Sequence, residues 1–177
     1  MNGISFAVPF KKRKALIIAN NELTEMLTFK SIDFRYLKNF YNIDYDDKGK
    51  NDIIPEIIIG QITAQKLNVK KGDLVKITSP LDQNLSFGIP RVNQCRISQV
   101  FNTKVLDFDN QVVFIPEEIG NSLFVRKKIP DGIDLRLDGL TSLDVKDKIL
   151  DKFPFLNVTS WKDTHHQLFE AMKLEKI

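Results

Sequence analysis

The chain has 177 residues, 42% of them hydrophobic, which is enough to bury a core in one domain or in two small ones. Its 26 basic and 23 acidic residues are interspersed and give a net charge of +3, which favours a solvated surface over a nucleic-acid interface. One cysteine excludes an internal disulfide and any site built from several cysteines. No apolar run approaches the roughly 18 residues of a membrane-spanning helix, so the chain as given is expected to be soluble.

The first elements are predicted from apolar runs and turn residues. The run 15–19 ends at Asn20-Asn21, a typical hairpin turn, and a second strand is predicted up to Ile32. Asp33 is placed to cap a short helix over 34–40. The basic run 11–14 could contact phosphate or a membrane surface, but such runs are more often solvated loops.

The middle of the chain alternates strands with short helices. A buried strand is predicted at 56–60, one or two helical turns at 61–67, and a further strand at 74–78. Between the last two, Gly72 supplies a position that can take a positive φ, and Asp73 caps the turn.

Two more strands follow. They are predicted at 93–101 and 111–115, with 107–110 as the bend between them. Cys95 lies in the first of these strands and is expected to be a buried, unreactive thiol. Pro116 suits the first position of a short helix through Phe124, because its missing N–H would be unpaired there.

The last third reads as strand, helix and strand. A strand is predicted at 133–137, a helix at 143–153 capped by Thr141, and a strand at 156–159. Pro154 ends the helix because it disfavours helical geometry at the residue before it.

The final segment, 161–177, is predicted to be an amphipathic helix. Ser160 and Asp163 form an imperfect capping box at its start. Its apolar stripe is expected to pack on the domain body and consists of Trp161, Leu168, Phe169 and Met172. The sequence ends within the helical pattern, as in a segment taken from a longer protein.

The elements together predict an α+β fold, with a strand-rich middle set into a β-α-β frame made by the two chain ends. No internal repeat is evident in the sequence.

Three segments resemble permeases of the lipoprotein-releasing ABC transporter family (LolC and LolE), whose periplasmic domain is MacB-like. They are 57–75, with Ile57-Ile58-Ile59-Gly60 and Gly72-Asp73; 87–109, with Phe87-Gly88-Ile89-Pro90 and Asp107-Phe108-Asp109; and 161–176. The last, W-x(6)-L-F-x-A-M-x-L-E-K, is the most specific.

The resemblance implies a domain plan. Residues 1–52 and 130–160 would form a porter-like α/β frame, and 53–129 an inserted, mostly-β, sabre-like subdomain. The opening is shorter than in the family, so the first part of the frame is expected to be truncated or remodelled. Segment 161–177 would lead to a membrane span in the full-length protein, on the periplasmic face of the bacterial inner membrane.

The segment 79–92 is the candidate functional site. It is a long connection between two strands, and such a length is unusual unless the loop is functional or disordered. In an extended strand, Leu85, Phe87 and Ile89 would share one side. The loop would either fold back, so that Phe87 plugs the local core, or project as a hairpin whose exposed apolar tips await a partner.

The family resemblance implies that this hairpin is a hook that recruits the soluble lipoprotein carrier (LolA). The implied carrier-binding residues are Phe87, Gly88, Ile89, Pro90 and Arg91, with Leu85 on the same apolar side and Arg91 placed for an acidic rim. The implied partners are the carrier, a second permease subunit that is LolE-like or identical, a separate cytoplasmic ATPase and the lipoprotein substrate. No nucleic-acid partner is expected.

Signs of catalysis are weak. His165-His166 point about 100° apart on a helix, unlike a metal-binding pair. The sequence has no nucleophile elbow and no phosphate-binding glycine motif, so no cofactor and no enzymatic activity are expected. The main rival to the permease hypothesis is a small β-barrel adaptor or DNA-binding regulator built on the unit 67–78, whose binding would weaken steeply with salt.

Overall fold

The computed structural model describes residues 3–45, 54–80, 91–125, 129–139 and 142–164. The chain forms two compact units. The barrel unit is Ala7–Asp134, and the terminal unit combines Met1–Phe6 with Leu135–Ile177. These limits differ from the expected ones, because the strands before residue 53 pair with strands of the middle segment and complete one sheet with them.

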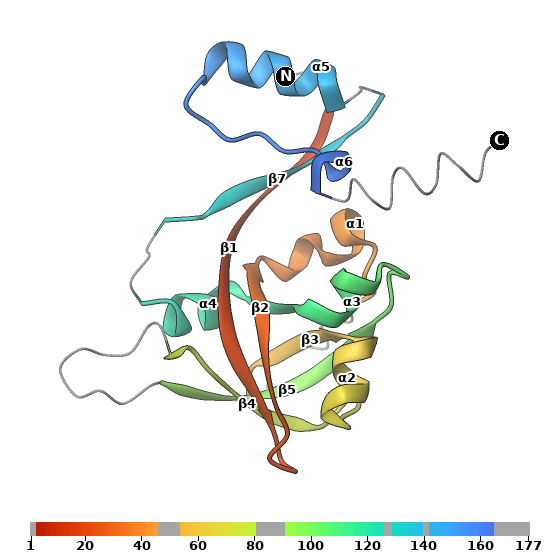
Figure 1. Cartoon of the computed structure of the whole chain (residues 1–177), viewed down its shortest axis with the longest axis vertical. Coiled ribbons are helices and arrows are strands. Elements are labelled where there is room, and N and C mark those ends of the chain that lie inside the picture. The colour runs from red at the N-terminus through yellow and green to blue at the C-terminus, as the bar shows by residue number, and fades with distance from the viewer. Residues whose placement is uncertain (1–2, 46–53, 81–90, 126–128, 140–141, 165–177) are drawn as a thin grey trace. The chain divides into compact units, whose positions relative to one another are not determined.

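The barrel unit alternates strands with short helices (Figure 1). In chain order these are β1 (Ile4–Ala19), β2 (Thr24–Ile32), the 3-10 helix η1 (Phe34–Tyr36), α1 (Leu37–Tyr41), β3 (Glu56–Gly60), α2 (Gln61–Leu67), β4 (Leu74–Thr78), β5 (Val92–Phe101), α3 (Leu106–Gln111), β6 (Val112–Pro116), α4 (Glu117–Leu123) and β7 (Gly132–Leu137). Strands β1 and β7 each continue into the terminal unit.

The sheet closes on itself. Its strand order is β2-β6-β3-β5-β4-β1-β7, and β1 also pairs with β2, so β1 to β6 form a ring. Closure gives each of these strands a neighbour on both sides, which removes the unpaired edges of an open sheet. The interior holds large apolar side chains with no exposure, among them Ile17, Phe29, Ile77 and Ile97.

The ring has a pseudo-twofold pattern. Exchanging β1, β2 and β3 with β4, β5 and β6 leaves every pairing unchanged: two antiparallel hairpins, the parallel pairs β2–β6 and β3–β5, and the antiparallel pairs β3–β6 and β1–β4. Ile58 pairs with Phe114, and a seven-residue helix follows each of their strands. The fold therefore contains a repeat that the sequence does not reveal.

A second apolar cluster packs outside the barrel interior. Leu37 and Ile43, near α1, lie against residues of the sheet that include Ile32, Ile58 and Phe114. Asp33 caps this region as predicted, because its side chain accepts a bond from Arg35 N.

Most predicted elements of the barrel unit are confirmed. The turn before β4 has Gly72 at φ +95°, and Asp73 accepts a bond from Lys70 N at 2.9 Å, as expected. Two predictions are wrong: residues 107–110 are part of helix α3 rather than a bend, and the basic run 11–14 lies within β1 rather than in a loop.

A smaller correction concerns Pro116. Helix α4 begins at Glu117, so Pro116 occupies the capping position just before it.

The terminal unit contains the start of β1, the end of β7 and two helices, α5 (Ser142–Lys152) and α6 (Trp161–Thr164). Helix α5 matches the predicted one and buries Val145, while its expected cap, Thr141, lies outside the described residues. The strand predicted at 156–159 is absent, because these residues have no strand partner and remain irregular.

Candidate functional site

The candidate site is the connection between β4 and β5. The last paired residues are Thr78 and Val92, so residues 79–91 join two strand ends that lie side by side. In the equivalent hairpin of the other half, residues 19–23 join the paired Ile18 and Thr24. A connection as short as 19–23 is therefore enough to close this kind of hairpin, and the connection 79–91 is longer than the ring requires.

Most predicted hook residues lie outside the described residues. Leu85, Phe87, Gly88, Ile89 and Pro90 belong to this group. Arg91 is described, and it lies on the surface at the base of the connection.

The base of the connection rests on helix α4. Arg91 Nη1 lies 3.5 Å from the carbonyl oxygen of Ser122, in the last turn of that helix. The neighbouring Val92 is 54% exposed, which leaves an apolar side chain beside a cation. In the other half, Asn21 Nδ2 donates to the carbonyl oxygen of Leu67 at the end of α2, at 3.2 Å. Each hairpin is therefore fixed by a side chain on a helix carbonyl.

The capping box before the terminal segment is confirmed. Asp163 N donates to Ser160 Oγ at 3.3 Å, and Ser160 N donates to Asp163 Oδ2 at 2.8 Å. The bond from the Ser160 backbone, with help from Lys146, lowers the pKa of Asp163. Of the predicted apolar stripe, Leu168, Phe169 and Met172 lie outside the described residues, as do the two histidines, and the side chain of Trp161 is not described.

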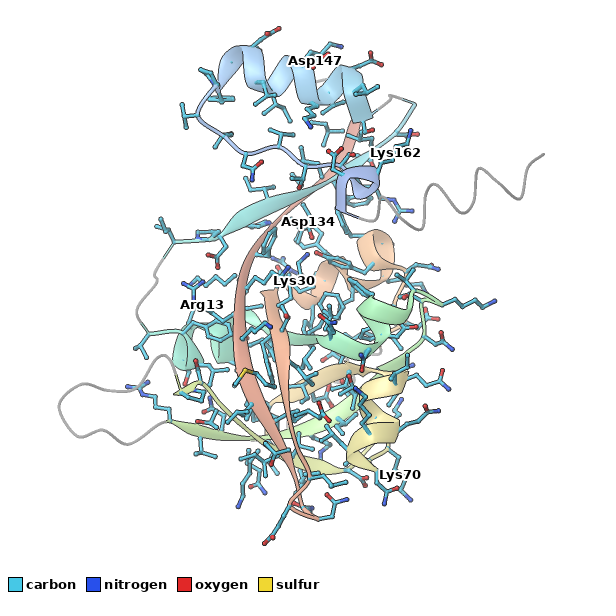
Figure 2. All side chains as sticks on the ribbon, in the orientation of Figure 1. Arg13, Lys30, Lys70, Asp134, Asp147 and Lys162 are labelled. Atoms are coloured by element: carbon cyan, nitrogen blue, oxygen red, sulfur yellow. The ribbon has the colours of Figure 1, made fainter. Side chains whose placement is uncertain are left out.

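The sequence did not predict a half-buried ionic cluster in the barrel unit. Lys30 on β2 forms an ion pair with Asp134 on β7, and Tyr41 on α1 donates its hydroxyl hydrogen to the same carboxylate (Figure 2). The Lys30 ammonium lies 4.3 Å from the ring centre of Phe10 and 5.1 Å from that of Tyr41. Burial lowers the pKa of Lys30 and the Asp134 carboxylate opposes this, while burial raises the pKa of Tyr41.

A groove runs beside helix α2, and the sequence gave no sign of it. Two adjoining hollows of about 250 and 540 Å³ share Gln61 and Gln65 as lining residues. Ala64, Val69 and Val100 supply apolar surface, and Lys70, Lys71 and Lys104 supply positive charge. Helix α3 lies next to α2 and contributes Asp109.

Asp109 holds the loop that carries Lys104. Its carboxylate is buried and accepts bonds from Thr103 N and Lys104 N, at 2.9 and 3.0 Å, and from Thr103 Oγ1 at 2.7 Å. Because these donors already satisfy it, this carboxylate supports the loop rather than serving as a free acid or base.

Cys95 has no exposed surface, and burial raises the pKa of its thiol to about 12. A thiol held in this neutral form is a poor nucleophile, as the sequence predicts. In the described part of the chain, no group of three or more His, Cys, Asp or Glu residues could hold a metal ion. Among the same residues, no helix is both long enough and apolar enough to cross a bilayer.

Comparison with solved structures shows where this fold occurs. The periplasmic region of MacB from Actinobacillus actinomycetemcomitans matches with a TM-score of 0.55 at 10% identity, over 86% of this chain and 67% of that one. The extracellular domain of the noncanonic ABC-type transporter YknZ from Gram-positive bacteria gives 0.51 at 14% identity, over 86% and 78%. No family model and no curated protein sequence matches the chain. The α+β fold is thus shared with extracytoplasmic domains of ABC-type transporters.

Proposed function

We propose that this chain is the periplasmic domain of a lipoprotein-releasing ABC transporter permease, and that the segment 79–92 recruits a soluble lipoprotein carrier. The domain is non-catalytic. It lies on the periplasmic face of the bacterial inner membrane, and ATP hydrolysis takes place in a separate cytoplasmic subunit.

The observation that carries the proposal is the unequal pair of hairpins. Both join antiparallel strands of one pseudo-symmetric ring, yet the connection 79–91 is more than twice as long as 19–23. Hairpin connections are usually about 2–5 residues long, and a connection of about 12 residues or more is uncommon unless it is functional or disordered. The shared fold with a transporter domain supports a role in transport, and the added segment is where a partner specific to this protein would bind.

The side chains of the segment 79–92 suit a carrier with a hydrophobic cavity. Leu85, Phe87 and Ile89 alternate with smaller residues, so an extended segment would offer three apolar side chains to a concave partner. At the base of the connection, Val92 adds an exposed apolar side chain and Arg91 adds a positive charge. This charge would face acidic residues at the rim of the carrier's cavity.

The remaining partners follow from the same proposal. The segment 161–177 would lead into a membrane span, and a second permease subunit, LolE-like or identical, would complete the complex. Motion driven by the ATPase would reach the domain through the span and accompany release of the lipoprotein to the carrier.

The test is a binding measurement with matched variants. Phe87→Asp with Ile89→Asp should abolish binding to the LolA-like carrier encoded in the same genome, with no change in circular dichroism or melting. The control places the same change on the equivalent hairpin, at Leu23 and Met26, which are 44% and 59% exposed. Leu23→Asp with Met26→Asp should bind the carrier normally. Binding that survives the first pair, or is lost equally in both, rejects the assignment.

The rival function, a DNA-binding or adaptor barrel, has one supporting observation, the closed barrel with a basic run on β1. Two of these basic side chains are engaged within the fold: Lys11 Nζ donates to Asn121 Oδ1 at 2.6 Å, and Arg13 pairs with Asp131 at 3.2 Å. Titration with duplex DNA at two salt concentrations separates the two functions, because only a phosphate-binding protein would show a steep salt dependence.

A further inference from the structure

The groove beside α2 is not required by the fold. The pseudo-twofold makes Ala64 equivalent to Gly120 and Val100 equivalent to Ser31. In the second half these positions are tightly packed: a Cβ atom added to Gly120 would lie 2.0 Å from Ser31 Oγ. In the first half, Ala64 and Val100 instead line the larger hollow, of about 540 Å³. The same architecture therefore packs these positions against each other in one half, whereas in the other half they border a hollow.

The open place has a definite chemistry. Its apolar surface comes from small side chains, and its amide groups come from Gln61 and Gln65, one turn apart on α2, and from Asn68, which caps the C-terminus of that helix. Lys70, Lys71 and Lys104 add three positive charges.

The two carboxylates of the groove bond to backbone and hydroxyl donors, and no ion pair joins them to the ammonium groups of these lysines in the described part of the chain. Asp109 accepts backbone and hydroxyl hydrogens of the 103–104 loop, and Asp73 accepts from Lys70 N. Within the described part of the chain, no ion pair joins Lys70, Lys71 or Lys104 to an acidic side chain.

The charged rim is also held in place. Lys104 has φ +62°, and its backbone N–H donates to Asn102 Oδ1 at 2.9 Å. Asn102 Nδ2 in turn donates to Gln61 Oε1 at 2.5 Å, which ties the loop to α2. Lys71 Nζ donates to Gln99 Oε1 at 3.2 Å. A preformed rim loses less conformational freedom when a partner binds.

We propose that this groove is a docking surface for an acidic, extended segment of a partner protein, with small apolar side chains between its carboxylates. Alternation along such a segment would direct small side chains to Ala64, Val69 and Val100 and carboxylates to the three lysines. The amides of α2 would bond its backbone. None of its lining residues belongs to the segment 79–92, so the inference holds whatever that segment binds.

The probe is a fluorescein-labelled peptide of alternating glutamate and alanine, added to the full chain and followed by fluorescence anisotropy. A peptide of alternating lysine and alanine is the control and should not bind. Amide shifts in a two-dimensional nuclear magnetic resonance spectrum should map to α2 and to the loops 68–73 and 102–105.

Two variants separate the groove from general charge. Lys70→Glu with Lys71→Glu and Lys104→Glu should weaken binding about tenfold or more, since each rim charge contributes modestly. Lys14→Glu with Lys38→Glu and Lys148→Glu makes the same change in net charge at other lysines and should bind the acidic peptide much more strongly than the groove variant. Gln65→Trp, which fills the groove without changing charge, should also weaken binding about tenfold.

The proposal fails if the acidic peptide does not bind, if both triple variants lose binding equally, or if Gln65→Trp has no effect. It also fails if the lysines of the groove are needed only for duplex DNA or for anionic vesicles, which would assign the charge to a different class of partner.

Discussion

Lys30 and Asp134 form an ion pair across 104 positions of sequence, and it joins β2 to β7 in the barrel unit. The Lys30 side chain is 14% exposed and the Asp134 side chain 27% exposed, so each charge depends on the other for much of its stabilisation. Phe10 and Tyr41 complete the surroundings of the ammonium. The pair thus fixes β7 onto the barrel at the residue where the barrel unit ends.

Asp134→Asn should lower the free energy of unfolding by about 2–3 kcal/mol, because it leaves a mostly buried ammonium without its counter-charge. Urea denaturation at pH 7 measures the loss. Adding Lys30→Met should recover more than half of it, since the double variant buries no unpaired charge.

The control for this experiment is the pair Lys38–Asp44, 3.4 Å apart with side chains 74% and 86% exposed. Asp44→Asn should change stability by less than about 0.5 kcal/mol. Equal losses for Asp44→Asn and Asp134→Asn would contradict the structural role given to Lys30.

Gly120→Ala should destabilise the protein although alanine is the better helix former by about 1 kcal/mol. The added methyl group would lie 2.0 Å from Ser31 Oγ and 2.4 Å from Ser31 Cβ, so the α4–β2 contact must open. Ser31→Gly removes both atoms and should restore most of the stability in the double variant, as a double-mutant cycle from urea titrations would show.

Gly60 provides the contrasting case. A Cβ atom there would lie 2.0 Å from the backbone oxygen of Asp109, which no side-chain substitution can remove. Gly60→Ala should therefore remain destabilised whatever second substitution is made at Asp109. If Ser31→Gly does not rescue Gly120→Ala, the packing described between α4 and β2 is wrong.

Stability should fall at alkaline pH because of Cys95. Burial raises the pKa of this thiol from 9.0 to about 12, so above pH 9 the unfolded chain releases a proton that the folded chain retains. The thiol contribution is constant below pH 9 and then decreases by about 1.4 kcal/mol for each pH unit up to about pH 12.

The comparison is between the parent chain and Cys95→Ala, by urea denaturation from pH 7 to pH 10. Between pH 9 and pH 10 the parent should lose about 1 kcal/mol more than the variant, because the unfolded thiol is already half deprotonated at pH 9. Other groups, such as Tyr41, titrate in both proteins and cancel. Parallel pH profiles would mean that the thiol is not buried.

Local patterns in the sequence predicted most elements of the barrel unit. The run 56–60, the helix after it and the glycine turn before β4 carry their own signals, because burial, periodicity and turn chemistry act within a few residues. The Ser160–Asp163 capping box is of the same kind.

Long-range pairing was not predictable in this way. The parallel pairing of Thr28 with Val112, which is needed to close the ring, depends on partners far apart in sequence. Helix α3 was missed because Asp109 and Asn110 are typical turn residues, whereas the carboxylate of Asp109 bonds the preceding loop and supports the helix. The groove beside α2 has no sequence signal either, since it arises from a packing difference between equivalent positions.

Strand β1 has a mechanical consequence. Inside the barrel unit it pairs with β2 from Lys11 to Ile18 and with β4 from Leu16 to Ala19, so a ladder holds it from Lys11 to Ala19 and two ladders hold it where they overlap. The bonds of an antiparallel ladder lie perpendicular to the strand. A pull that enters along β1 would load these bonds in shear, and they would have to break together rather than peel one by one. A domain that is pulled through this strand can therefore bear tension without unfolding progressively from the end of the strand.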